Sequence, residues 1–148
     1  MADTTAQLEI EEWIRNEWLP RQYGQRFNKG NLKLSSGGFF EFDAVSEDEK
    51  VVVTISTSRA KTVRGRGGAG KIQKIRADMF FLLLAEAELR SVVLTEPDML
   101  EFWQKEKVNG RVPDSITFIS VSLPPELMTR LQNARAAAEK EVSPRQQE

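Results

Sequence analysis

The chain has 148 residues, of which 40% are hydrophobic and 29% charged, and its 21 Lys and Arg nearly balance its 22 Asp and Glu, for a net charge of −1. It contains no cysteine and no histidine, which excludes disulfides, thiolate and imidazole catalysis and cysteine-based metal sites, so any bound metal would be a hard cation held by oxygen. No apolar run approaches the roughly 20 residues of a membrane span, and the acidic N-terminus has no signal-peptide pattern, so the sequence predicts a cytoplasmic protein without a membrane partner.

The first part of the chain predicts one helix and a short strand. Apolar residues at helical intervals predict a helix over residues 6–19, which Pro20 ends. Residues 21–30 predict a loop, and the alternation of Leu32 and Leu34 with polar neighbours predicts a short strand.

Two strands rich in aromatic and β-branched residues follow. They cover residues 39–45 and 51–56 and are joined by a polar connection of hairpin length. Strand alternation places Phe42 and Ala44 on one face of the first strand and Asp43 on the other.

Helices and strands alternate in the rest of the chain. The predicted elements are a helix over 70–88, a strand over 91–94, a helix over 97–107, a strand over 115–121 and a last helix that opens at Pro124. The whole order is α, β, β, β, α, β, α, β, α, which predicts one α/β domain with a mixed sheet flanked by helices. We expect this domain to cover residues 1–142 and a polar tail to cover 143–148. No oligomeric state is indicated.

A basic, glycine-rich segment lies between Ser58 and Ala77. It holds seven positive charges and no acidic residue, although the chain as a whole has a net charge of −1. Such charges repel one another unless an anion or an acidic surface meets them, or unless the segment is a solvated loop. We expect nucleic acid to be the partner, with an acidic protein surface as the alternative. The side chains predicted to contact phosphate are Lys61, Arg64, Arg66, Lys71 and Lys74.

Two short motifs in this segment do not predict catalysis. Residues 65–71 fit the phosphate-loop pattern G-x-x-x-x-G-K, but Ile72 stands where a Ser or Thr would bind Mg²⁺. Ser58 and Lys61 fit the S-x-x-K pattern of acyl-serine enzymes, whose other elements are missing. The sequence therefore favours a flexible glycine-rich loop ahead of a helix.

The hairpin and its surroundings resemble the PD-(D/E)XK, or restriction-endonuclease-like, nuclease superfamily, whose core order is αβββαβ. The resemblance extends from the first helix to the strand over 91–94. It implies that an acid on the second strand and an acid-x-Lys triplet on the third hold Mg²⁺ and the attacking water. Carried over by position, Asp43 matches the first acid, Thr54 the second acid and Ser56 the lysine.

The two substitutions on the third strand point to binding rather than cleavage. A threonine hydroxyl is a weak, neutral ligand for Mg²⁺, and a serine brings no positive charge. The resemblance therefore implies a degenerate site in which Asp43 is at most a weak metal ligand and no cofactor is needed. An active Mg²⁺-dependent nuclease stays open as an alternative, in which Lys74 or Lys71 replaces the missing lysine and Glu41 or Glu12 supplies an acid.

Overall fold

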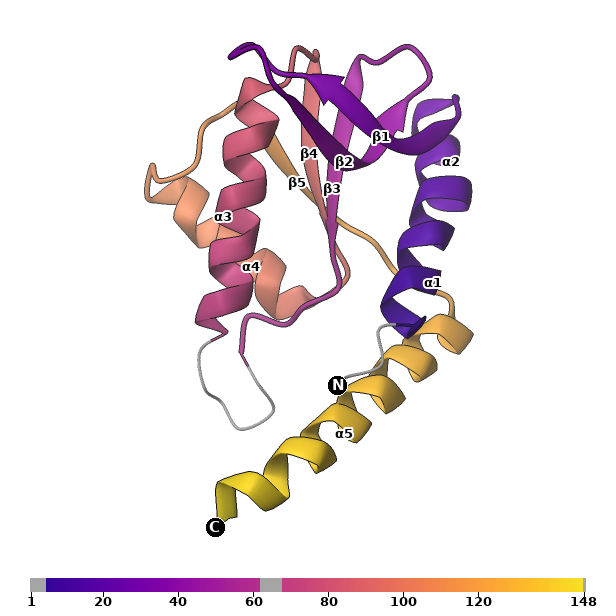
Figure 1. The fold of residues 1–148 in the computed structure, drawn as a ribbon, viewed down its shortest axis with the longest axis vertical. Coiled ribbons are helices and arrows are strands. Elements are labelled where there is room, and N and C mark those ends of the chain that lie inside the picture. The colour runs from indigo at the N-terminus through magenta and orange to yellow at the C-terminus, as the bar shows by residue number, and fades with distance from the viewer. Residues whose placement is uncertain (1–4, 62–67, 148) are drawn as a thin grey trace.

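The computed structural model describes residues 5–61 and 68–147 of the chain, with side chains as far as Ala138 (Figure 1). Five strands form one sheet in the order β1-β2-β3-β4-β5. They are β1 (Phe27–Lys33), β2 (Phe39–Ser46), β3 (Val51–Ser56), β4 (Leu89–Leu94) and β5 (Ile116–Ser120). Neighbouring strands are antiparallel from β1 to β3 and parallel from β3 to β5, so β2 alone runs against the other four.

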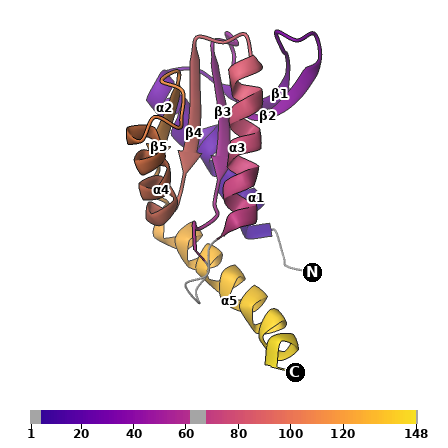
Figure 2. The same cartoon turned by 90° about the vertical axis from the view of Figure 1, so that its left-hand side faces the viewer.

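Helices cover both faces of this sheet (Figures 1 and 2). They are α1 (Thr5–Trp13), the π-helix η1 (Ile14–Trp18), α2 (Leu19–Tyr23), α3 (Ala69–Leu84), α4 (Pro97–Val108) and α5 (Pro125–Gln147). Strand alternation divides the core in two: Val52 and Val92 pack with α3 and α4, whereas Val53 and Val93 pack with the N-terminal helices and α5. The predicted α/β class, with a mixed sheet flanked by helices, is confirmed.

The N-terminal helix passes through Pro20 instead of ending there. A π-turn precedes the proline, and the Leu19 N–H donates to the Ile14 carbonyl five residues earlier. This wider turn accommodates the ring of Pro20, which lies in the first turn of α2 and has no N–H to leave unpaired. The helix ends at Gly24, whose φ of 71° stops the helical repeat and whose N–H donates to the Pro20 carbonyl at 2.8 Å.

Three other boundaries differ from the predicted ones. Residues 27–30 belong to strand β1 rather than to a loop; β1 lies at the sheet edge and buries only Phe27 and Leu32, so its sequence lacks clear alternation. Helix α3 ends at Leu84 instead of residue 88, because the chain becomes extended at Ala85. Helix α5 continues to Gln147, past the predicted start of the polar tail, and projects beyond the sheet (Figure 2).

A β-bulge interrupts β2 at Asp43. Asn28 of β1 opposes Val45, but Gly30 opposes Phe42, so Asp43 and Ala44 together face one residue of β1. The extra residue reverses the alternation: Phe42 packs against α3 and α4, and Ala44 packs in the opposite core. The prediction that the Phe42 and Ala44 side chains share a face is therefore wrong. Because Asp43 lies in the bulge, the alternation of a regular strand does not determine which way it faces.

Candidate functional site

Asp43 lies at the point where β2 leaves β3. The two strands are paired at Ala44–Val53 and Val45–Val52, and nearer its start β2 crosses toward α3. There the Phe40 ring stacks on Phe81 of α3, with 4.1 Å between ring centroids. The strands therefore form a wedge that opens at Asp43.

Backbone and side-chain hydrogen bonds hold Asp43 at this wedge. Its Oδ2 accepts from the Ile55 N–H at 2.7 Å, taking the place of a β2 carbonyl, and its own carbonyl accepts from Arg15 Nε at 2.7 Å. Among the described residues no hydrogen bond reaches Asp43 Oδ1, so one carboxylate oxygen keeps its capacity to accept.

Thr54 and Ser56, at the two substituted motif positions, lie on the β3 face that packs toward α3. Thr54 is only 3% exposed, and its Oγ1 has no hydrogen-bond partner in the part of the chain that the structure describes. Ser56 Oγ accepts from the Ser58 N–H at 3.3 Å. Neither hydroxyl brings charge, so the positions that the resemblance assigns to an acid and a lysine are electrically neutral.

Lys74 and Asp78 form an ion pair on α3. Lys74 Nζ lies 3.2 Å from Asp78 Oδ2; the Lys74 side chain is 71% exposed and that of Asp78 only 15%. Burial raises the pKa of Asp78, the Lys74 ammonium lowers it, and the nearby Asp43 charge raises it. Asp78 is thus electrostatically coupled to both Lys74 and Asp43.

Glu11 of α1, on the other side of the sheet, is also coupled to Asp43. Burial and the Asp43 charge raise its pKa, whereas Arg15, Lys29 and Lys74 lower it. Sequence reasoning named Glu12 and Glu41 instead. The structure exposes Glu12 and places Glu41 in an exposed ion pair with Lys29, at 3.6 Å. The i+4 spacing from Lys74 could have pointed to Asp78; nothing in the local sequence separates Glu11 from Glu12.

We call Glu11, Arg15, Asp43, Lys74 and Asp78 the Asp43 cluster. Its charges come from three directions, because α1 and η1 flank one face of the sheet, α3 the other, and β2 the wedge between them. Among the side chains that the structure describes, in residues 5–61 and 68–138, no three acidic groups lie close enough to hold a metal ion together. With Thr54 neutral and Asp78 paired to Lys74, the residues present do not fit the Mg²⁺ that the resemblance implies.

The described lysines of the basic segment lie at one edge of the sheet. Lys61 follows β3, and Lys71 and Lys74 occupy the first two turns of α3, so all three lie where the parallel strands end; each is exposed. Arg64 and Arg66, predicted to contact phosphate with them, lie outside the described residues.

Gly68 closes the loop that joins β3 to α3. Its N–H donates to the Ala60 carbonyl at 2.7 Å, and a Cβ on Gly68 would lie 2.7 Å from the same oxygen. Only glycine permits this approach of two backbone segments. The contact fixes the backbone at Ala60 and Gly68, close in sequence to Lys61 and Lys71.

The chain matches no family model, no curated protein and no solved structure in the three comparisons made. None of the helices in the described part of the chain has the length and hydropathy needed to cross a lipid bilayer.

Proposed function

We propose that this protein is a non-catalytic domain of the restriction-endonuclease-like type that binds nucleic acid. The observation that carries the proposal is the position of Asp43, at the divergence of β2 and β3 and hydrogen-bonded to the Ile55 N–H of β3. That the protein is cytoplasmic is a prediction from the sequence.

The order of elements supports this type of fold. The helix α1, the three strands β1, β2 and β3, the helix α3 and the strand β4 follow one another as αβββαβ. The segment α4-β5-α5 extends this core at its C-terminal side, as the sequence predicts. An acidic residue at the parting of the second and third strands agrees with the resemblance.

Charge at the carboxyl edge of the sheet supports a phosphate-bearing partner. Lys61 and Lys71 are exposed and have no ion pair with a described residue, so both ammonium groups are available. Lys74 shares its charge with Asp78 but leaves most of its side chain in solvent. Lysine contacts to phosphate add affinity without selecting a sequence, so we expect binding with little sequence preference.

The chemistry of the Asp43 cluster supports binding over cleavage. Cleavage through this superfamily's chemistry needs a metal held by at least two anionic ligands and a cation near the attacked phosphate. Here Thr54 is neutral, and Lys74 of α3 is paired with Asp78.

Binding of a fluorescently labelled DNA duplex, followed by anisotropy, tests the proposal. We expect saturable binding by the whole chain and weaker binding by the double variant Lys61→Gln, Lys71→Gln. The control is the double variant Lys33→Gln, Lys105→Gln, which removes the same charge from exposed sites on β1 and α4. A chain that binds polyglutamate but no duplex would overturn the proposal in favour of docking to an acidic protein.

A further inference from the structure

A cavity of about 670 Å³ opens at the carboxyl edge of the parallel strands. β3 and β4 end at Ser56 and Leu94, so the segments that follow them emerge side by side, and α5 crosses below them (Figure 1). The lining side chains come from the segment after β3, the start of α4 and α5: Arg59, Glu96, Pro97, Asp98, Gln132, Arg135 and Ala136. Open α/β sheets commonly bind ligands outside the carboxyl ends of their strands.

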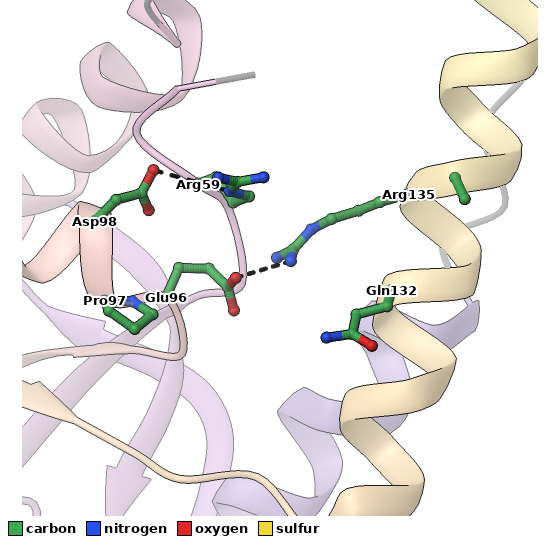
Figure 3. A pocket seen from close by; sticks show the side chains of 7 residues that line it. Arg59, Glu96, Pro97, Asp98, Gln132 and Arg135 are labelled. Atoms are coloured by element: carbon green, nitrogen blue, oxygen red, sulfur yellow. Dashed lines mark hydrogen bonds and ion pairs between the residues drawn. The ribbon is translucent and has the colours of Figure 1, made fainter. Parts of the chain in front are cut away.

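One wall of the cavity is an ion pair that ties α5 to the sheet. Arg135 donates to Glu96 Oε1 at 2.8 Å (Figure 3). Arg135 also donates to the Thr57 carbonyl, and Thr95 donates to Glu96 Oε2 at 2.9 Å. These two charged side chains satisfy each other, with 24% and 14% of their side-chain surfaces exposed. They shape the cavity and leave it close to neutral on this side.

The opposite wall leaves a cation available. Asp98 Oδ2 accepts from the N–H groups of Ala60 and Lys61, at 3.1 and 3.2 Å, and so fixes the backbone that carries Arg59. Arg59 Nε lies 3.9 Å from the same oxygen, a long ion pair, and 42% of its side chain is exposed. Arg59 makes no hydrogen bond with a described residue, so its guanidinium keeps its donors for a ligand.

Gln132 supplies a neutral donor and acceptor between the two walls. Its side chain extends from α5 into the cavity (Figure 3), and it makes no hydrogen bond with a described residue. A carboxamide that both donates and accepts suits the edge of a nucleobase or a sugar hydroxyl.

We propose that this cavity binds a phosphate-bearing nucleoside, with the phosphate on Arg59 and the base or sugar on Gln132. Its volume lies within the roughly 300–1,000 Å³ usual for small-molecule sites. Arginine is suited to phosphate because its planar fork donates two parallel hydrogen bonds. The ligand is a free mononucleotide or the 5′-phosphorylated end of a nucleic-acid strand, which present the same group. The site does not depend on the nucleic-acid contact proposed for Lys61 and Lys71.

Isothermal titration calorimetry of the full chain with AMP, GMP, CMP, UMP and inorganic phosphate tests this site. We expect at least one nucleotide to bind, more tightly than phosphate alone. Arg59→Gln should weaken that binding by about tenfold to a hundredfold, the range for lost hydrogen bonds to a charged group. Two oligonucleotides, one with a 5′-phosphate and one with a 5′-hydroxyl, identify the source of the phosphate. If only the phosphorylated oligonucleotide binds, the ligand is a strand end. If only the mononucleotide binds, the ligand is a free nucleotide.

A matched pair of variants on α5 controls for folding. Ala136→Trp places an indole in the cavity and should abolish nucleotide binding, whereas Ala137→Trp, at the next exposed residue outside the lining, should bind as the parent chain does. Duplex binding by Ala136→Trp should be unchanged, which separates this site from the proposed function. The inference is overturned if none of the probes binds the parent chain, or if Ala136→Trp binds as tightly as Ala137→Trp.

Discussion

The Asp43 carboxylate accepts the Ile55 N–H at 2.7 Å, so a side chain continues the pairing of β2 with β3 after their backbones part. Ile55 itself is buried in the core under the N-terminal helices. The same contact spans the wedge between the strands and leaves Asp43 Oδ1 without a hydrogen bond from a described residue. Structure and candidate chemistry thus depend on one residue, and substitutions can separate them.

Replacing Asp43 should affect stability through this hydrogen bond. Asp43→Ala leaves the Ile55 N–H without its acceptor and should lower the free energy of unfolding by about 1.5–3 kcal/mol, the range for hydrogen bonds to a charged group. Asp43→Asn keeps an acceptor oxygen and should cost less than half as much. Urea denaturation monitored by tryptophan fluorescence measures both values. Equal stability of the alanine variant and the parent would show that the contact contributes nothing.

Catalysis provides a second test at the same residue. We expect no nicking of supercoiled plasmid by the parent chain in Mg²⁺ or Mn²⁺, because Thr54 and Ser56 supply neither a second carboxylate nor a cation. Metal-dependent nicking that disappears in Asp43→Ala would contradict this expectation and assign the missing roles to Lys74 and Asp78.

The raised pKa values of Glu11 and Asp78 give a pH dependence of known sign. Burial is the main cause of both shifts, so the folded protein binds protons on these groups more readily than the unfolded chain. Their contribution to stability is therefore greatest at low pH and is lost as the pH rises from the ordinary carboxyl pKa through the raised one. Glu11→Gln should gain stability relative to the parent as the pH rises from about 4 to about 7. Parallel stability curves for variant and parent would contradict the shift.

Glu106 should behave in the opposite way. Two hydrogen bonds from Arg111, 2.6 and 3.0 Å long, lower the pKa of Glu106. A hydrogen bond from Arg76 lowers it further. Stability from this carboxylate is present above its ordinary pKa and is lost as the pH falls through the lowered one. Glu106→Gln should therefore lose more stability at neutral pH than at acid pH, measured by urea denaturation across the same range as Glu11→Gln. A loss that is independent of pH would refute the role of the arginine pair.

Gly68 and Gly70, at the N-terminal end of α3, should respond differently to replacement by alanine. Gly68→Ala brings a methyl group 2.7 Å from the Ala60 carbonyl oxygen and should destabilise the fold by about 1–3 kcal/mol, as overpacking does. Gly70→Ala, in the first turn of α3 with open space around it, should stabilise the fold by up to about 1 kcal/mol. Thermal unfolding of the two variants measures the contrast. Unchanged stability of Gly68→Ala would contradict the close backbone contact between Gly68 and Ala60.

Local sequence patterns predicted much of this architecture. The hairpin strands, α3, β4, α4 and β5 appear in the predicted order because each has a clear periodicity or a proline or glycine boundary. The path through Pro20 could not be predicted, since it depends on a π-turn that no local propensity encodes. The short strand near Leu32 was predicted, but its first part, residues 27–30, was predicted as a loop because an edge strand needs few buried residues.

The candidate site was predicted only in part, for a different physical reason. Asp43 and Lys74 were named from their positions along the chain, and the charge of each acts on Asp78. Glu11 and Asp78 were missed because their importance arises from burial beside Asp43, a tertiary property. The bulge that positions Asp43 is likewise set by pairing with β1, far from it in sequence.

The salt dependence of duplex binding tests the central claim most directly. Each lysine that neutralises a duplex phosphate releases counterions, so the log–log slope of the binding constant against salt should change by about 0.9 per contact. We predict that the double variant Lys61→Gln, Lys71→Gln has a slope shallower than that of the parent chain by about 1.8, and that the Lys33→Gln, Lys105→Gln control keeps the parent slope. Identical slopes and affinities for the parent and for Lys61→Gln, Lys71→Gln would contradict the claim that nucleic acid binds at this edge of the sheet.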